Sequence, residues 1–269
     1  MAAHNLIPRT PLHRAFCWAI VGSLRLLPKR TQAFVRTMHE PVARLDTDLG
    51  DVKMLATNTW EQWRLRSCRK EPETVAWLKE NLRPDDVLYD IGANIGAYTL
   101  LACTIQPTVR CVAVEPIATT YGHLVRNLAL NHFSERVQTI NVAVGPETRM
   151  GYFEVADFLP GTDAVGELKP GSTYARQSVL FVRLDDLASV FHMPPPTLIK
   201  ADIDGGELAL LAGAIETLKL SELRGILIEV DRDGTDSKVI EIIQSAGFKL
   251  VHRADKEKSG ISNLIFSRF

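Results

Sequence analysis

Residues 87–96 read VLYDIGANIG, a short apolar run that ends on an acid and leads into two glycines. The run at its start predicts a buried strand, and the apolar residues 98–103 after the second glycine predict a buried helix. Glycines in such a strand-to-helix turn let the backbone approach a bound nucleotide closely. This unit therefore predicts an α/β domain that binds a nucleotide-like ligand at the turn.

The spacing of these glycines separates two kinds of ligand. Dinucleotide-binding turns use G-x-G-x-x-G, but Asn94 and Ala97 stand at the second and third glycine positions counted from Gly92. The next glycine is Gly96 instead. A carboxylate at Asp90 would repel a pyrophosphate, whereas it would attract the ammonium in the methionine part of S-adenosylmethionine (SAM). The turn therefore favours SAM over a dinucleotide.

A second acid ends the next predicted strand, 110–115. Glu115 follows the turn by roughly 20 residues, a spacing that lets an acid accept hydrogen bonds from both ribose hydroxyls of an adenosine. NAD would use the same acid, so Glu115 by itself does not choose between the cofactors. After the third predicted strand, Ala143 and Val144 are expected to form the apolar wall that an adenine ring needs.

Helical and strand-like patterns alternate from about residue 70, as in a parallel sheet covered by helices on both faces. Strands are expected at 87–90, 110–115, 137–144, 197–202, 225–230, 248–251 and 263–266. Helices are expected at 71–83, 98–103, 121–130, 207–218 and 238–246. Two further strand-like segments, 151–155 and 178–184, are separated by glycines and prolines and predict a β insertion. We therefore expect one domain over 70–269 after an accessory segment, 1–69.

The accessory segment contains an apolar run, 15–24, that follows Arg9, His13 and Arg14 and loosely resembles a signal peptide. No small-x-small cleavage site follows it, and roughly ten apolar residues are too few to cross a bilayer, which takes about 20. The run predicts an accessory helix packed on the domain. Peripheral attachment to a membrane surface is the alternative.

Composition excludes some classes of function. The formal net charge is −1, so the chain has no basic excess that would neutralise many phosphates, and we expect no nucleic-acid partner. The four cysteines form no C-x-x-C pair and have no histidine at ligand spacing. Free thiols in a reducing compartment, the cytoplasm, are therefore expected.

Five segments resemble, in their order and spacing, FkbM-type methyltransferases: 90–96, 114–116, 126–131, 184–187 and 199–207. One departure is Asp204-Gly205, where the family usually has Glu-Gly. The resemblance covers the chain from about residue 70. It implies a class I methyltransferase fold, a Rossmann-like three-layer α/β sandwich around a mostly parallel seven-stranded sheet whose last strand is antiparallel. It also implies SAM as donor and methylation, usually at oxygen, of a sugar, a glycolipid or a secondary metabolite.

The pattern and the resemblance together predict a set of cofactor-binding residues: Asp90, Gly92, Asn94, Gly96, Glu115, Pro116, Ala143, Val144 and Asp202. The chemistry is assigned to acids near the end of the predicted strand 197–202. Methyl transfer requires an acceptor oxygen in line with the methyl group and a group that takes the hydroxyl proton. Asp202 is the hypothesised base, with Asp204 and Glu207 as further catalytic candidates. The alternative for the last two is that they only stabilise a helix N-terminus.

The acids Glu229, Asp231 and Asp233 raise the alternative of a divalent metal, but their spacing fits no EF-hand loop, and no metal is predicted. Two rival functions remain open: an NAD(P)-dependent oxidoreductase and a SAM-binding scaffold without activity. The acceptor, a small molecule or a glycan, is expected to bind the segment 156–177, together with Trp60, Trp63 and Arg66.

Overall fold

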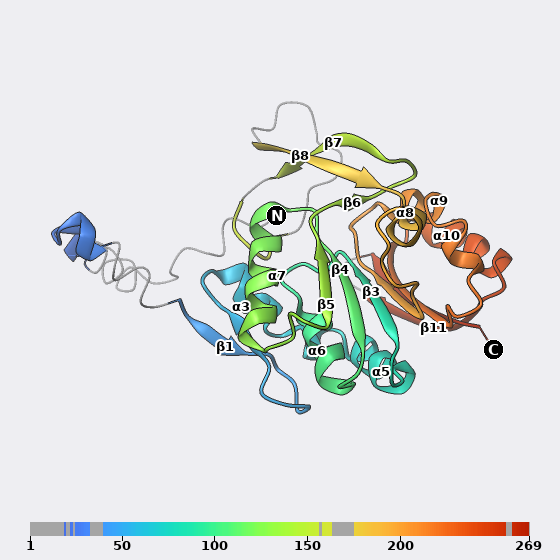
Figure 1. The fold of residues 1–269 in the computed structure, drawn as a ribbon, viewed down its shortest axis with the longest axis horizontal. Helices are drawn as coiled ribbons and strands as arrows, with labels where there is room; N and C mark the ends of the chain where they lie inside the picture. The colour runs from blue at the N-terminus through green and yellow to red at the C-terminus, as the bar shows by residue number, and fades with distance from the viewer. Residues whose placement is uncertain are drawn as a thin grey trace.

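The computed structural model describes residues 19, 22–23, 25–32, 40–155, 158–162, 175–256 and 260–268. A seven-stranded sheet forms its centre, with the strand order β11-β12-β10-β9-β3-β4-β5 (Figure 1). Their bounds are β3 Val87–Ile91, β4 Arg110–Val114, β5 Val137–Ile140, β9 Leu198–Ala201, β10 Gly225–Asp231, β11 Lys249–Lys256 and β12 Ile261–Ser267.

The directions of the strands confirm the predicted class I methyltransferase topology. Strands β10, β9, β3, β4 and β5 pair in parallel, whereas β12 lies antiparallel between β10 and β11. The chain starts at β3 in the middle, builds outward through β4 and β5, and then returns to β9 on the other side. Ligands of open α/β sheets bind at the carboxyl ends of the strands where the order reverses in this way. In this chain that point lies between β3 and β9.

Helices cover both faces of the sheet, which gives the three predicted layers. They are α5 Pro72–Asn81, α6 Ala97–Ile105, α7 Ala118–Leu130, α8 Leu184–Ser189, α9 Glu207–Ala212 and α10 Thr235–Ser245. Side chains of β3 alternate between the two cores: Leu88 packs with α5 and α6 residues, and Tyr89 and Ile91 pack with α9 and α10 residues. Each such fully buried apolar side chain stabilises the fold by about 1.5–3 kcal/mol.

Two sequence expectations about these elements were wrong. The expected strand 137–144 is split, since β5 ends at Ile140 and residues Ala143–Val144 form β6 in a separate three-stranded sheet. The break follows from Asn141, whose side-chain amide donates to the carbonyl oxygens of Glu115 and Pro116. The expected helix 207–218 ends at Ala212. At Gly213 a Cβ would lie 2.1 Å from the carbonyl oxygen of Gly145, and a 3₁₀ turn, Thr217–Lys219, follows.

The predicted β insertion is confirmed. It pairs β7 Arg149–Val155 antiparallel with β8 Ala175–Val182, and β6 joins β8 in parallel. This small sheet lies over the carboxyl ends of β4 and β5 (Figure 1). Most of the segment between its two long strands lies outside the described residues.

Residues before α5 pack on the domain as two short strands, β1 Val42–Arg44 and β2 Lys53–Leu55, and two short helices, α3 Thr59–Arg64 and α4 Ser67–Lys70. The buried side chain of Asn127 on α7 joins this segment to the domain, because it accepts from Leu55 N and donates to Ile95 O, each at 2.8 Å. The expected helix over 15–24 lies largely outside the described residues. Among the helices that the structure does describe, none is long and apolar enough to span a bilayer. Membrane attachment and the boundary at residue 70 stay predictions.

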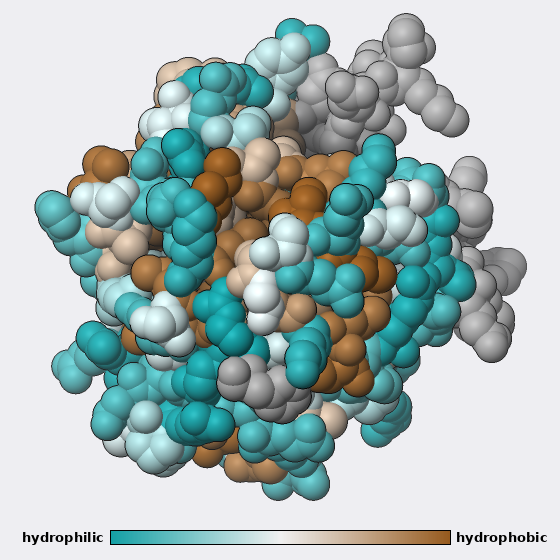
Figure 2. Space-filling model, turned by 90° about the vertical axis from the view of Figure 1, so that its right-hand side faces the viewer, coloured by the Kyte–Doolittle hydropathy of each residue, from teal (hydrophilic) through white to brown (hydrophobic). Residues whose placement is uncertain are grey.

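The surface on the side of α10 mixes hydrophobic with hydrophilic residues (Figure 2). Exposed large hydrophobic side chains of the chain include Val190 and Phe191 after α8, Ile215 after α9 and Ile242 on α10. Such scattered exposure is ordinary for a folded domain.

Candidate active site

A cavity of about 460 Å³ lies at the carboxyl ends of β3, β4 and β9. Its wall includes most of the sequence-predicted residues: Gly92, Asn94, Glu115, Pro116, Ala143, Val144, Asp202 and Asp204. Phe153 and Phe181 of the small sheet also line it, with ring centroids 5.5 Å apart, as do Arg64 and Thr162. The topological switch point therefore holds a cavity of the size that suits a small-molecule ligand.

Three predicted site residues lie outside this wall. Asp90 is fully buried behind it, where its carboxylate accepts from Thr99 Oγ1 at 2.6 Å. Gly96 precedes α6 and packs against Leu124. Glu207 is buried, and its carboxylate accepts from Gly205 N at 2.8 Å. None of the three lines the cavity, and their roles at the site stay predictions.

The turn after β3 requires glycine at residue 92. Gly92 has a φ of +75°, which side chains rarely adopt, and a Cβ there would lie 1.9 Å from the carbonyl oxygen of Asp202. The turn thus touches the end of β9 backbone to backbone. Because Gly92 and Asp202 both line the cavity, this contact leaves no gap in its wall between β3 and β9.

Gly92→Ala should lower the free energy of unfolding by at least about 2 kcal/mol, because the new methyl group overlaps a backbone atom and the left-handed conformation is strained. Urea denaturation measures the change. Gly234→Ala is the matched control, since Gly234 has a φ of +103° but no atom within 4 Å of a Cβ, and it should cost only about 1 kcal/mol. Equal losses in the two variants would show that the backbone contact is unimportant.

Glu115 is held in one orientation at the end of β4. Its carboxylate accepts from Asn94 N at 3.0 Å and from Ile117 N at 2.8 Å, and the residue is 5 % exposed. Each carboxylate oxygen has further acceptor capacity. Because the orientation is fixed before any ligand binds, Glu115 can receive the two hydroxyls of a ribose without reorganising.

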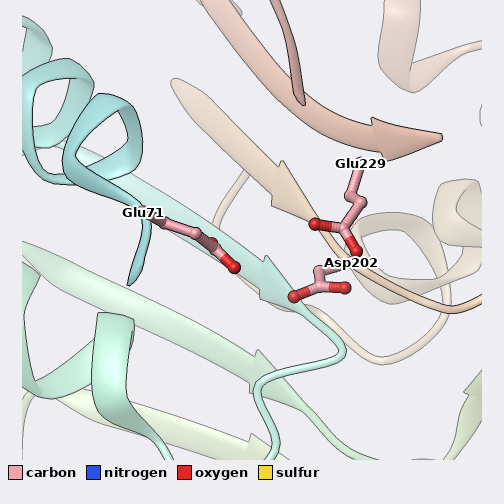
Figure 3. Close-up of side chains that lie close together, drawn as sticks. All are labelled: Glu71, Asp202 and Glu229. Carbon is pink, nitrogen blue, oxygen red and sulfur yellow. The ribbon is translucent and has the colours of Figure 1, made fainter. Parts of the chain in front are cut away.

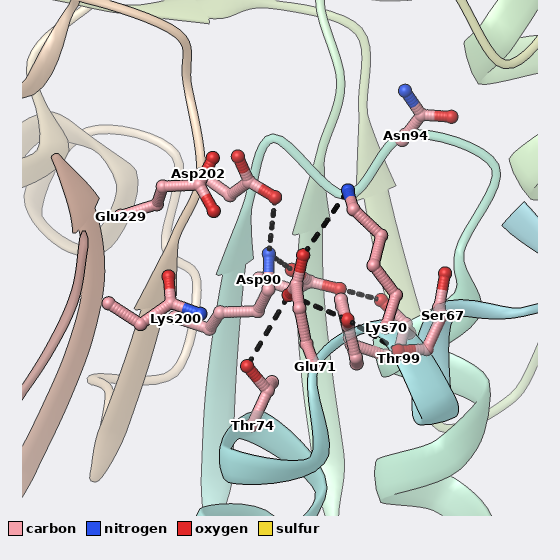
Figure 4. Close-up of polar contacts among 12 residues, drawn as sticks. Ser67, Lys70, Glu71, Thr74, Asp90, Asn94, Thr99, Lys200, Asp202 and Glu229 are labelled. Carbon is pink, nitrogen blue, oxygen red and sulfur yellow. Dashed lines mark hydrogen bonds and ion pairs between the residues drawn. The ribbon is translucent and has the colours of Figure 1, made fainter. Parts of the chain in front are cut away.

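A buried lysine lies on β9, two residues before Asp202, which lines the cavity. Lys200 on β9 is 2 % exposed, and its Nζ lies 3.6 Å from Asp90 Oδ1 and 3.5 Å from Asp202 Oδ2 (Figure 4). Burial works to lower the pKa of Lys200, but the carboxylates of Asp202 and Asp90 outweigh it and raise the pKa above its usual value. Lys200 is therefore an ammonium that neutralises Asp90 and orients Asp202.

Three carboxylates converge beside this lysine. Oxygens of Glu71, Asp202 and Glu229 all lie within 4.8 Å of one another (Figure 3). Lys256 Nζ lies 3.0 Å from Glu71 Oε1 and also bonds Glu229. Burial favours the neutral form of Glu71, yet Lys256, Lys200 and a hydrogen bond from Tyr98 together lower its pKa to about 2.

This convergence is not the acidic group that the sequence suggested for a metal. Asp231 and Asp233 are exposed and lie outside it. The three converging carboxylates have two lysine ammonium groups against them, from Lys200 and Lys256. Those lysines supply the positive charge that a divalent cation would otherwise supply, and the expectation of no metal stays a prediction.

The order of the strands, the cavity at their carboxyl ends and the oriented Glu115 are accompanied by a match in sequence. A family described as the methyltransferase FkbM domain matches residues 90–250. The chain belongs to the FkbM methyltransferase family. The predicted resemblance and the predicted methyltransferase activity are confirmed, and nothing in the match favours an oxidoreductase.

Two sequence relatives agree with this membership. Hexuronic acid methyltransferase AglP of Haloferax volcanii is 27% identical over 188 residues, which cover 69% of this chain and 73% of AglP. The 31-O-demethyl-FK506 methyltransferase FkbM of Streptomyces tacrolimicus is 28% identical over 202 residues, covering 65% and 76%. Magnesium protoporphyrin IX methyltransferase of Synechocystis, solved with bound SAM, aligns with a TM-score of 0.49 at 10% identity, covering 78% and 83%.

Sequence reasoning missed several residues of this FkbM-family site. Lys200 had a local signal, a lysine inside an otherwise apolar strand that is buried on both faces. Glu71 and Lys256 had none, because their contact joins residues 185 positions apart. The expected acceptor residues Trp60, Trp63 and Arg66 do not line the cavity, whereas their neighbour Arg64 does.

Proposed function

We propose that the enzyme binds SAM in the cavity at the carboxyl ends of β3, β4 and β9. The adenine would lie against Ala143 and Val144, the ribose hydroxyls on Glu115, and the methionine part along the turn at Gly92. The oriented carboxylate of Glu115, held by two backbone N–H groups, is the observation that supports this placement best. The close backbone approach at Gly92 provides the floor on which such a ligand can rest.

We further propose that the acceptor is a hydroxyl of a small molecule or a glycan, and that nucleic acid is not a substrate. Two relatives, a hexuronic acid methyltransferase and a 31-O-demethyl-FK506 methyltransferase, support this class. Bound SAM supplies a methyl group on a positively charged sulfur. Asp202 and Asp204, which both line the cavity near the start of α9, would hold the acceptor oxygen in line with that group and exclude water.

Asp202 is proposed as the proton acceptor. The acceptor oxygen forms a bond to the methyl carbon, the carbon–sulfur bond breaks with its electron pair left on sulfur, and the hydroxyl proton passes to the carboxylate. Lys200, 3.5 Å from Asp202 Oδ2, keeps that carboxylate in one position. Such proton transfer contributes about 10²- to 10⁴-fold to rate.

A direct test compares ligands and then transfer. S-adenosylhomocysteine should raise the melting temperature of the full chain, and NADH should not. Labelled SAM incubated with a fractionated extract should then give a labelled product that mass spectrometry identifies as an O-methyl compound. Stabilisation by NADH alone would overturn the proposal. Stabilisation by S-adenosylhomocysteine without transfer to any fraction would favour the non-catalytic scaffold.

Glu229 should give the rate a pH dependence near neutrality. Burial and then the charge of Asp202 raise the pKa of Glu229 to about 7, against the opposing effect of Lys256. As pH rises through 7, Glu229 becomes charged, and its negative charge beside Asp202 favours transfer of the acceptor's proton into the site, so kcat should increase. Because the pKa of Glu229 is raised in the fold, stability should fall as pH rises from about 4.5 to 7, where the unfolded chain has ionised Glu229 and the folded chain still holds its proton.

Glu229→Gln tests this pH dependence. In the variant, kcat should no longer rise as pH increases through 7. Its free energy of unfolding should also fall less than that of wild type as pH rises from about 4.5 to 7. If kcat of Glu229→Gln still rose with pH as in wild type, another group would be responsible for the rise.

A further inference from the structure

We propose that Arg64 binds the carboxylate of the methionine part of SAM, so that helix α3 completes the cofactor site. This inference rests on the proposed function above. It assigns a role in cofactor binding to the segment before residue 70, for which the sequence suggested acceptor contacts only.

The charges on the cavity wall distinguish Arg64. Among the described residues that line the cavity, positive charge comes from Arg64 and Arg149. Arg149 belongs to the adenine side: its guanidinium lies 4.9 Å from the ring centroid of Phe181, and Phe181 pairs with Ala143 in the small sheet. Its Nε also lies 3.0 Å from Glu147. Arg149 is therefore placed to contact a purine ring and not the amino-acid end of SAM.

Arg64 lies instead beside the turn after β3. Its Nε donates to Gly161 O at 3.3 Å. The next residue, Thr162, accepts from the side-chain amide of Asn94 at 3.4 Å. Arg64, Thr162 and Asn94 thus meet on the stretch of wall that the methionine part of SAM would follow.

Helix α3 holds Arg64 in place through buried contacts. Glu61, fully buried one turn before it, lies 2.5 Å from His123 Nδ1 on α7 and accepts from the amide and hydroxyl of Thr57. Asn58 begins the helix by accepting from Trp60 N and donates to Pro160 O. The side chain is therefore presented by a fixed helix, and Arg64 as a residue is half-buried.

The acids that line the rest of the cavity explain why the carboxylate of SAM needs a cation beside it. The amino-acid end of SAM has an ammonium and a carboxylate. The wall is rich in acids, among them Glu115, Asp202 and Asp204, and their charges repel that carboxylate. A guanidinium matches a carboxylate through two parallel N–H···O bonds. Arg64 is the wall cation placed on that side of the cavity.

The test compares two ligands that differ only in the amino-acid part. Isothermal titration calorimetry on the full chain would use S-adenosylhomocysteine and 5′-methylthioadenosine, which has the adenosine and the sulfur but no carboxylate or ammonium. Arg64→Ala should weaken S-adenosylhomocysteine by about 10- to 100-fold, as expected for loss of a charge-assisted hydrogen bond. It should leave the affinity for methylthioadenosine within about 2-fold.

Arg66→Ala is the matched control, because Arg66 is an exposed arginine of the same segment that lines a different cleft, and it should affect neither ligand. Arg64→Gln keeps much of the side-chain packing and should repeat the selective loss if Arg64→Ala does not fold. Unchanged binding of S-adenosylhomocysteine, or equal weakening of both ligands, would overturn the assignment of Arg64. A wild-type chain that binds neither ligand would overturn the proposed function and the assignment with it.

Discussion

Asp202→Asn should reduce kcat by about 10²- to 10⁴-fold while S-adenosylhomocysteine still binds within a few fold of wild type. The amide keeps the size and the position of the side chain, which is 22% exposed and lines the cavity, but it cannot take a proton at neutral pH. Transfer from labelled SAM measures kcat, and calorimetry measures binding.

Asp204→Asn provides the comparison for this variant. Asp204 lines the same cavity two residues further on, and we expect a rise in KM for the acceptor with a smaller effect on kcat. Full turnover in Asp202→Asn would end the proposal that Asp202 is the base. A loss of S-adenosylhomocysteine binding as large as the loss of rate would assign Asp202 to cofactor binding alone.

Lys200→Met should lower the free energy of unfolding by about 3–5 kcal/mol, the usual cost of leaving one member of a buried ion pair without its partner. Asp90 is 0% exposed, and its Oδ1 has no hydrogen-bond partner in the described part of the chain, so its charge depends on the ammonium of Lys200. Urea denaturation at pH 7 measures the loss.

Two further variants make the Lys200 result specific. Adding Asp90→Asn to Lys200→Met should restore part of the stability, because the orphaned charge is removed. Lys219→Met removes a lysine whose side chain is 62% exposed and paired with Glu216, and it should cost less than about 1 kcal/mol. If Lys200→Met were as stable as wild type, Lys200 would not be the counter-charge of Asp90.

The order of the sheet and most of the cavity wall could be predicted from the sequence, because they depend on local patterns. The turn after β3 and Glu115 after β4 each follow a strand directly, and parallel strands bring their carboxyl ends to one edge. The same geometry explains where Gly92, Asn94 and Asp202 lie.

The direct role expected for Asp90 could not be judged from its position in the sequence. Successive side chains of a strand point to opposite faces. Asp90 shares the face of Leu88, where α6 covers it and Thr99 bonds it. The side chain of Asp90 therefore points toward the helices α5 and α6 and not toward the cavity. It acts on the site through its ion pair with Lys200.

Contacts between distant parts of the chain were beyond local patterns. Lys256 on β11 meets Glu71 at the start of α5, and Gly213 touches the backbone of Gly145, which shortens α9. Side-chain periodicity also did not show that Arg64, and not Trp63 or Arg66, faces the cavity. These features depend on how finished elements pack.

The place of β12 in the sheet has a consequence for biosynthesis. Because β12 is inserted between β10 and β11, a nascent chain that has left the ribosome only as far as β11 has an open edge on β10. Unpaired edges of this kind invite pairing with other chains. Lys256, at the end of β11, also reaches Glu71 and Glu229 in the finished fold. The charge balance beside Asp202 is therefore complete only after the final hairpin has been made, and premature termination inside that hairpin should yield an aggregation-prone chain instead of a partly active enzyme.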